Sequence, residues 1–233
     1  MLKQHTIEDV RQALLHKKEI SHDPNAMLEI VNASFIANEP AIFGQPNHDY
    51  IEREWDWYMS QSLNVTDIPG EVPAIWQDVS DYDGFINSNY GWCQFSEENH
   101  SQYDKALANI RNDINTRQAA MIFTRPTMHE DAVENGRSDF MCTYAHQLMV
   151  RDGKLNYHVY MRSNDVVFGY RNDKAWADYV WQRASTELNI PKGVMFWNAA
   201  SLHVYPRHRH LVTRGENHDM YSHGTSTSRF TRG

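Results

Sequence analysis

The stretch from Ser138 to Asp173 reads SDFMCTYAHQLMVRDGKLNYHVYMRSNDVVFGYRND. Its centre, His146 to Arg162, contains two strand-like runs on either side of an Asp-Gly pair. Such a pair between two strands is typical of a tight hairpin turn. The stretch therefore predicts a β-hairpin, and it places Cys142 just before the first strand.

Helical and strand patterns continue on both sides of this hairpin. We expect helices from Thr6 to about Lys18, from about Asp49 to Ser62, from Asp104 to Ile114, and from Lys174 to about Leu188, the last capped by Asp173. Further strands are expected at Ala119 to Thr124, where an apolar run indicates a buried strand, at Gly193 to Trp197 and at Leu202 to Tyr205. The proline-rich segment from Ile68 to Val79 indicates a loop that carries Trp76 to a surface or a cleft.

Composition narrows the class of protein. The chain has 233 residues, 41% of them hydrophobic, which favours one globular domain over residues 1–214 and a loosely ordered tail over 215–233. A net charge of -8 opposes binding to nucleic acid, because phosphate backbones attract clustered Lys and Arg. No apolar run approaches the length of a membrane span, and the first residues lack a secretory core, so a cytoplasmic protein is expected.

Two cysteines, Cys93 and Cys142, occur in the chain. A domain of this size needs no disulfide, so free thiols are expected. A free cysteine is more often a small buried side chain than a nucleophile, and the residue type alone leaves both interpretations open.

Glu54 lies on the apolar stripe of its predicted helix, with Ile51, Trp55 and Tyr58. This spacing points a carboxylate toward the interior. The alternative is that Glu54 lies at the edge of the stripe, in a salt bridge with Arg53 or Lys105.

Several longer motifs recur in one order along the chain. They are ASFIANEP with IFG (33–44), YIEREWDWY (50–58), DIPGEVPAIWQ (67–77), INSNYGW (86–92), MIFTRPTM (121–128), the stretch 138–173, and WNAASLHVYPRH (197–208). Together they resemble the thymidylate synthase superfamily, and more closely its phage deoxycytidylate hydroxymethylases. The resemblance implies an α+β fold of thymidylate synthase type, with a mixed β-sheet core flanked by helices and one sheet face forming a homodimer interface.

The resemblance also implies a reaction. A one-carbon unit passes from the co-substrate 5,10-methylenetetrahydrofolate to C5 of dCMP with addition of water, giving 5-hydroxymethyl-dCMP and tetrahydrofolate. C5 of a pyrimidine is inert toward electrophiles until a nucleophile adds at C6, and a thiolate suits that reversible addition. Cys142 is the expected nucleophile. Glu54 would organise water and proton transfers, and burial on an apolar stripe would raise its pKa as that role requires.

Binding residues follow from the same resemblance. The substrate would be held by Arg162 and Ser163 at the phosphate, by Asn164, by His203 and Tyr205 at the sugar hydroxyl, and by Arg117 donated from the partner subunit of a homodimer. The folate would lie against Trp76, with Asp165 and Gly169 in its pocket. Gln118 departs from the family, which has a second Arg there, and this weakens the expected grip on the phosphate.

Asp173 indicates the choice of base. Thymidylate synthases have an Asn at this position, whose carboxamide accepts from uracil N3–H and donates to O4. Cytosine reverses both roles, so its partner is a protonated carboxyl, or a carboxylate facing N3-protonated cytosine. The alternative for Asp173 is a plain helix N-cap.

Other functions stay open at this point. dUMP or CMP could replace dCMP on the same scaffold, and a non-catalytic nucleotide- or RNA-binding protein is a remote alternative. His203, His208 and His210 could form a metal site at alternating strand positions, although no carboxylate or thiol completes the set and no metal cofactor is expected. Thymidylate synthases close the site with a C-terminal segment that ends in apolar residues. The tail here ends with Ser228 to Gly233 and lacks that apolar cover, which agrees with admission of water. The resemblance places such an enzyme in a phage-infected bacterium that makes 5-hydroxymethylcytosine DNA.

Overall fold

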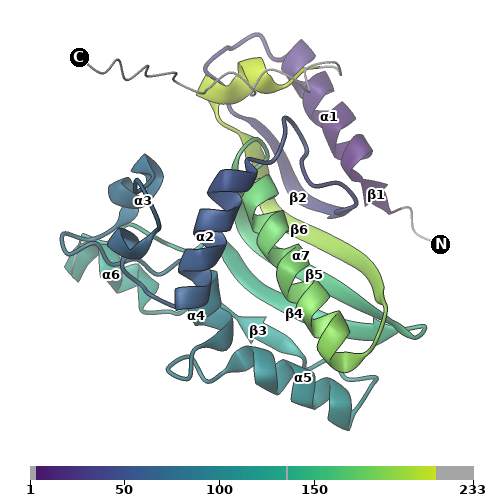
Figure 1. Cartoon of the computed structure of the whole chain (residues 1–233). Helices are drawn as coiled ribbons and strands as arrows, with labels where there is room; N and C mark the ends of the chain where they lie inside the picture. Colours follow the sequence, from purple (N-terminus) through teal and green to yellow (C-terminus); the bar gives the residue numbers. More distant parts are fainter. Residues whose placement is uncertain (1–3, 135, 214–233) are drawn as a thin grey trace, which may run out of the picture.

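The computed structural model describes residues 4–134 and 136–213, and the predicted tail, 215–233, lies outside them. Its elements are β1 (His5–Thr6), α1 (Ile7–Ile20), β2 (Leu28–Ile36), α2 (His48–Ser60), η1 (Val65–Asp67), α3 (Ala74–Val79), α4 (Tyr90–Phe95), α5 (Gln102–Asn112), β3 (Ala120–Ile122), α6 (Met128–Glu134), β4 (Thr143–Arg151), β5 (Lys154–Asp165), α7 (Gly169–Leu188), β6 (Lys192–Val204) and η2 (Pro206–Leu211). The strands form one sheet in the order β1-β2-β6-β5-β4-β3 (Figure 1).

The sheet is mixed, as the α+β prediction required. β5 and β6 run parallel, whereas β4 pairs antiparallel with β5 and β2 antiparallel with β6. The hairpin prediction is confirmed: Arg151 pairs with Lys154, and the two turn residues, Asp152 and Gly153, have φ angles of 51° and 68°. Two consecutive positive φ angles are the geometry of the turn that matches the twist of paired strands.

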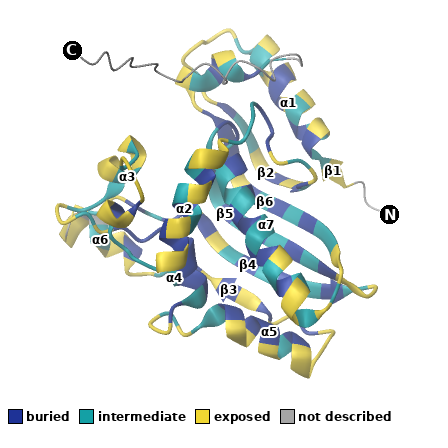
Figure 2. Cartoon of the chain, in the orientation of Figure 1, coloured by how far each residue is buried: buried dark blue, intermediate teal, exposed yellow. Residues whose placement is uncertain are grey.

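The core lies between the sheet and α7, which runs along one sheet face (Figure 1). Alternate residues of β5, among them Leu155, Tyr157 and Val159, are fully buried, because neighbouring side chains on a strand point to opposite faces. Trp176 and Val180 of α7 are also fully buried. Figure 2 shows the resulting alternation of buried and half-buried residues along the central strands.

The helix starts in the first half of the chain match their sequence signals. Thr6 caps α1 and forms a capping box with Asp9. Asn47 caps α2, which begins and ends one or two residues before the expected positions. The loop expected from Ile68 to Val79 is wrong in its second half, because the Pro73 carbonyl accepts from the N–H groups of Trp76 and Gln77 and begins the short helix α3.

Two strands differ from expectation. The strands predicted at Gly193 to Trp197 and Leu202 to Tyr205 are one strand, β6, because β2 and β5 pair with it on both sides and override the weak local signal. The run from Ala119 to Thr124 forms only a short strand, β3, at the edge of the sheet. It is not buried throughout, since Ile122 is 62% exposed.

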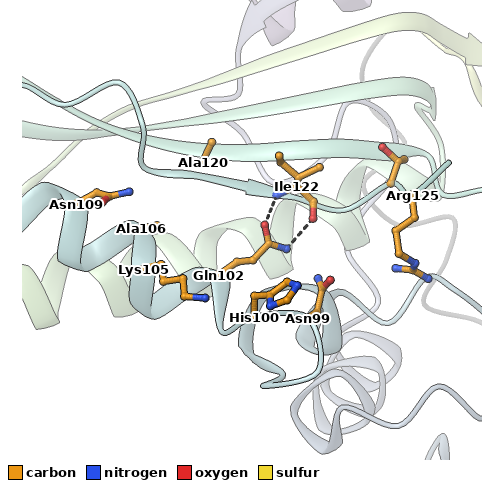
Figure 3. Close-up of a pocket in the computed structure, with 10 residues that line it drawn as sticks. Asn99, His100, Gln102, Lys105, Ala106, Asn109, Ala120, Ile122 and Arg125 are labelled. Atoms are coloured by element: carbon orange, nitrogen blue, oxygen red, sulfur yellow. Dashed lines mark hydrogen bonds between the residues drawn. The ribbon is translucent and has the colours of Figure 1, made fainter.

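A side chain covers the free edge of β3. Both hydrogen-bonding groups of the Gln102 amide pair with Ile122, since Oε1 accepts from its N–H and Nε2 donates to its C=O, each at 2.7 Å (Figure 3). An amide pairs in the same way as a neighbouring strand would, so Gln102 blocks pairing with another chain at this point.

The start of α7 is the main correction. The helix begins at Gly169, and Asp173 lies within it, so the prediction that Asp173 caps a helix from Lys174 is wrong. β5 also continues past Arg162 to Asp165. Asp165 is the residue that accepts from the first backbone N–H groups of the helix, from Phe168 at 2.9 Å and from Gly169 at 3.3 Å. None of the described helices is both long and apolar enough to span a membrane.

Candidate active site

Cys142 lies directly before β4, and its side chain is exposed to solvent. Arg162 of β5 holds the segment that carries it. The Arg162 backbone N–H donates to the Cys142 carbonyl at 2.8 Å. The guanidinium Nε donates to the Met141 carbonyl at 3.0 Å, and Nη2 donates to the Phe140 carbonyl at 2.5 Å. The thiol is therefore positioned by the residue expected to bind phosphate beside it.

The surroundings of Cys142 favour the neutral thiol in the single chain. Although solvent reaches the side chain, the protein around it raises its pKa to about 11 by desolvation. Arg162 lowers this pKa, whereas the negative charges of Asp173 and Asp139 raise it. The expectation that arginine favours the thiolate holds for Arg162, but desolvation by the surrounding protein outweighs the effect of Arg162 on the pKa.

Glu54 is buried on α2, as the apolar stripe predicted. Its Oε1 accepts from the Tyr50 hydroxyl at 2.9 Å, and the Trp76 indole N–H donates to that hydroxyl at 3.2 Å. Desolvation raises the pKa of Glu54 to about 8, and the charge of Asp173 adds to the rise. The salt-bridge alternative is wrong for Arg53, which donates to the carbonyls of Pro69 and Glu71.

Asp173 accepts a hydrogen bond on each carboxyl oxygen. The Tyr90 hydroxyl donates to Oδ1 at 3.1 Å, and the Asn164 amide donates to Oδ2 at 2.8 Å. Desolvation raises the pKa of Asp173 to about 7, and these two bonds partly offset the rise. Glu54, buried on α2, and Asp173, half-buried on α7, thus both have pKa values raised toward neutral pH, and we call them the carboxyl pair. The charge of Asp173 acts on both Glu54 and Cys142.

Tyr90 connects this pair to the nucleophile segment. Its hydroxyl lies 2.8 Å from Oγ1 of Thr143, the residue after Cys142, and its ring stacks on Tyr58 with a centroid distance of 5.3 Å. The motif INSNYGW contains Tyr90, but the sequence alone predicts no role for this residue. Tyr50 lies four residues before Glu54, and this spacing places the two side chains next to each other on a helix. The spacing could therefore have predicted the hydrogen bond from the Tyr50 hydroxyl to Glu54.

The residues expected at the phosphate and sugar lie on the neighbouring ends of β5 and β6. Oγ of Ser163 lies 3.5 Å from Nδ1 of His203. His203 is buried, and its Nε2 has no hydrogen-bond partner among the described residues. Tyr205 follows β6, is partly exposed, and packs edge-on against the His203 ring at 4.7 Å. An unmatched buried ring nitrogen beside a serine hydroxyl is suited to a polar ligand.

The residues expected at the folate lie on two sides of the carboxyl pair. Asp165 and Gly169 form the start of α7, and the charge of Asp165 acts on Asp173. Trp76 lies half-buried on α3 and is joined to Glu54 through Tyr50. Both groups therefore adjoin the carboxyl pair.

Arg117 lies apart from this cluster. It is exposed, and its carbonyl accepts from Gln147 at 2.7 Å. Gln147 is five residues along β4 from Cys142, a separation of roughly 16 Å in a strand. Within one chain, the structure does not bring Arg117 to Cys142.

The metal alternative is wrong in its geometry. His208 and His210 lie in η2 after the strand, so they do not alternate with His203 on β6. Residues 4–134 and 136–213 contain no group of three or more His, Cys, Asp or Glu that could hold a metal ion. A recess of about 360 Å³ between α5 and β3, which includes Lys105 and Arg125, contains none of the residues expected to act (Figure 3).

The class of protein follows from comparison with known families. Residues 47–223, about three quarters of the chain, match the family model described as thymidylate synthase, and the chain belongs to this family. The fold agrees: the thermostable thymidylate synthase A from Bacillus subtilis superimposes with a TM-score of 0.62 at 22% identity, covering 81% of this chain and 72% of that one. Thymidylate synthase from Bacillus subtilis subsp. natto is 27% identical over 161 residues, which is 66% of this chain and 55% of the relative.

A particular branch of the family is much more similar. The deoxycytidylate 5-hydroxymethyltransferases of Enterobacteria phages T4 and T2 are each 48% identical over 229 residues, covering 91% of this chain and 93% of theirs. The resemblance inferred from the order of the motifs is thereby confirmed.

Proposed function

We propose that the chain is a deoxycytidylate 5-hydroxymethyltransferase, which transfers a one-carbon unit from 5,10-methylenetetrahydrofolate to C5 of dCMP with addition of water. The observation that carries the proposal is the half-buried carboxyl group of Asp173, which Tyr90 and Asn164 hydrogen-bond and whose charge acts on Cys142. The similarity to phage enzymes with this name supports the same substrate.

Cys142 is the nucleophile in this mechanism. Its Sγ bonds to C6 of the base, and the electron pair of the C5–C6 double bond moves to C5, which becomes nucleophilic. Because desolvation by the surrounding protein raises the pKa of the thiol, proton removal must accompany substrate binding. Arg162 is the cation beside it that favours the thiolate.

Glu54 is the proton carrier. A carboxyl group with a pKa of about 8 exchanges protons readily near neutral pH, and this matches the demand of a general acid and base. Its hydrogen bond to Tyr50, which is in turn bonded by Trp76, fixes its position. Glu54 therefore moves the protons of the reaction and positions the water whose addition in the last step gives the hydroxymethyl group.

The folate supplies the one-carbon unit, and the residues proposed to hold it are Trp76, Asp165 and Gly169. The half-buried indole of Trp76 offers an aromatic surface on which a flat pterin can stack. Asp165 is already committed to the first N–H groups of α7 through its carboxylate, so it fixes the helix start that forms this side of the pocket.

The nucleotide would be held at three groups: its phosphate, its sugar hydroxyl and its base. Ser163 and Arg162 face the phosphate. His203 and Tyr205 face the sugar hydroxyl, and the unpartnered Nε2 of His203 supports a ligand at this position. Asp173 faces the base, where the complex with cytosine holds one proton between the carboxyl group and N3.

A homodimer completes the site in this proposal. The sheet face opposite α7 carries half-buried side chains such as Gln147, His158 and Phe196, and the last two stack at 4.9 Å. Figure 1 shows α7 on the other face, so this face is suited to a second copy. Arg117 is hydrogen-bonded to Gln147 beside the same face, and this supports its donation to the partner's phosphate site.

Product identification tests the function. The purified protein is incubated with 5,10-methylenetetrahydrofolate and, separately, dCMP, dUMP and CMP, and each nucleotide is analysed by mass spectrometry, with reactions lacking folate as the control. dCMP is expected to gain CH2O. A reaction confined to dUMP or CMP, or gain of a methyl group in place of hydroxymethyl, would overturn the proposal.

A further inference from the structure

Asn164 lies next to Asp173, and both the oxygen and the nitrogen of its side-chain amide form hydrogen bonds within the protein. It is 3% exposed, near the end of β5. Its Oδ1 accepts from the Trp197 indole N–H at 3.2 Å, and its Nδ2 donates to Oδ2 of Asp173 at 2.8 Å. Both ends of the amide are therefore occupied within the protein.

The chemistry of Trp197 fixes the orientation of this amide. An indole N–H can only donate, so the amide oxygen must face Trp197, which is fully buried. The amide NH2 group must then face Asp173. A flipped amide would place two donors against each other and an oxygen against a carboxyl oxygen, and burial makes both mismatches costly.

This arrangement makes the two oxygens of Asp173 unequal. Oδ2 accepts from a group that can only donate, so it carries no proton toward that partner. Oδ1 pairs with the Tyr90 hydroxyl, which can donate or accept and also contacts Thr143. A proton on Asp173 is therefore favoured on Oδ1.

The inequality decides which pyrimidine fits. A neutral carboxyl group pairs with cytosine when one oxygen accepts from the amine and the other donates to N3. The same group pairs with uracil if the proton moves to the other oxygen, because uracil reverses the donor and the acceptor. An aspartic acid alone therefore does not distinguish the two bases, and a neighbour that fixes the proton does.

We propose that Asn164 is a positioning residue that sets base selectivity, by fixing Oδ2 of Asp173 as the acceptor for the cytosine amine and leaving Oδ1 to share a proton with N3. Asn164 then acts through Asp173, in place of the direct contact with the substrate that the family resemblance implied. This inference rests on the proposed function, since it takes Asp173 to face the base.

The test compares specificity constants for dCMP and dUMP in Asn164→Ala and Trp197→Phe. In Asn164→Ala the dCMP to dUMP ratio is expected to fall roughly tenfold to a hundredfold, through a rise in the constant for dUMP. Trp197→Phe keeps Asn164 but removes the group that orients its amide, so the ratio should fall in the same direction by a smaller factor. If Asn164→Ala does not fold, Trp197→Phe tests the same proposal by itself.

A merely structural role would give a different result. Loss of packing would lower both constants by the same factor and leave the ratio unchanged, and that outcome in folded protein overturns the inference. Wild-type product analysis separates the two proposals. If the wild type does not hydroxymethylate dCMP, the proposed function fails; if it does and the variants keep the wild-type ratio, only the role of Asn164 fails.

Discussion

The two ends of the β5 and α7 pair are built from different chemistry. At the hairpin end, Leu155 and Tyr157 are fully buried, and Trp181 of α7 donates to the Leu155 carbonyl at 2.8 Å. At the other end β5 buries Asn164, and α7 holds the half-buried carboxyl group of Asp173, which the surrounding protein desolvates. Packed apolar side chains stabilise the first end, whereas the second holds groups that would be more stable in water.

The difference shows where stability is given up for function. Burial raises the pKa of Glu54 to about 8 and that of Asp173 to about 7, so their charged forms are disfavoured in the folded chain. Buried carboxyl groups with neutral-range pKa values are typical of sites that move protons. Changes at the site end should therefore alter the reaction, and changes at the hairpin end should alter only folding.

The largest effect is expected for Cys142→Ser. Both hydroxymethylation and exchange of the C5 hydrogen of dCMP with solvent should fall to background, because both require addition at C6. Exchange is followed by tritium release from labelled dCMP. Near-normal exchange in this variant would remove Cys142 from its role.

A mixing experiment tests the contribution of Arg117. Arg117→Ala and Cys142→Ser proteins are each expected to be inactive, and random exchange of subunits makes half of the dimers hybrids with one intact site of two. Activity should then recover to about a quarter of the wild-type value. Absence of recovery, with subunit exchange demonstrated by mass spectrometry, would mean that each site is built within one chain.

The third prediction concerns stability at the site end. Because folding raises the pKa of Glu54 above its unfolded value, wild-type stability should decrease as the pH rises from about 4.5 to 8. Glu54→Gln lacks this titration, so its stability should not fall in the same way. The difference in free energy of unfolding, variant minus wild type, should be roughly 2 to 4 kcal/mol more positive at pH 9 than at pH 4.5. Denaturant unfolding at the two pH values measures the difference, and an equal effect at both would contradict the assignment.

The smallest effect is expected at the hairpin. A Cβ on Gly153 would meet nothing within 4 Å, so Gly153→Ala adds only the strain of a φ angle of 68°. This should lower the free energy of unfolding by about 1 kcal/mol and leave the dCMP to dUMP ratio unchanged. Gly91→Ala is the matched contrast, since its Cβ would lie 1.7 Å from the Tyr58 carbonyl oxygen and disturb the ring that stacks on Tyr90. A changed ratio in the Gly153 variant would break the distinction between the two ends.

The sequence predicted best what short-range signals determine. The Asp-Gly turn, the helix start at Thr6 and the inward direction of Glu54 depend on neighbours within a few residues, and all three are present. The position of Cys142 before β4 followed from the same hairpin pattern.

The contacts at the site end could not be predicted from short-range signals. Asp173 precedes a helical pattern and so looked like a cap, but α7 starts earlier because Asp165 accepts from its first N–H groups. The contacts of Tyr90 with Thr143 and Asp173 join residues 53 and 83 positions apart. Such contacts depend on the folded sheet, and no local spacing encodes them.

The most direct test of the account is the base preference of Asp173→Asn. A carboxamide restores the pairing that uracil needs and leaves cytosine facing at least one mismatched group, a cost on the order of 1 to 3 kcal/mol in a buried site. The ratio of specificity constants should therefore shift from dCMP toward dUMP by roughly tenfold to over a hundredfold, with hydroxymethylation retained. If folded Asp173→Asn kept the full wild-type preference for dCMP, Asp173 would be only a structural partner of Tyr90 and Asn164, and the account of base choice would be contradicted.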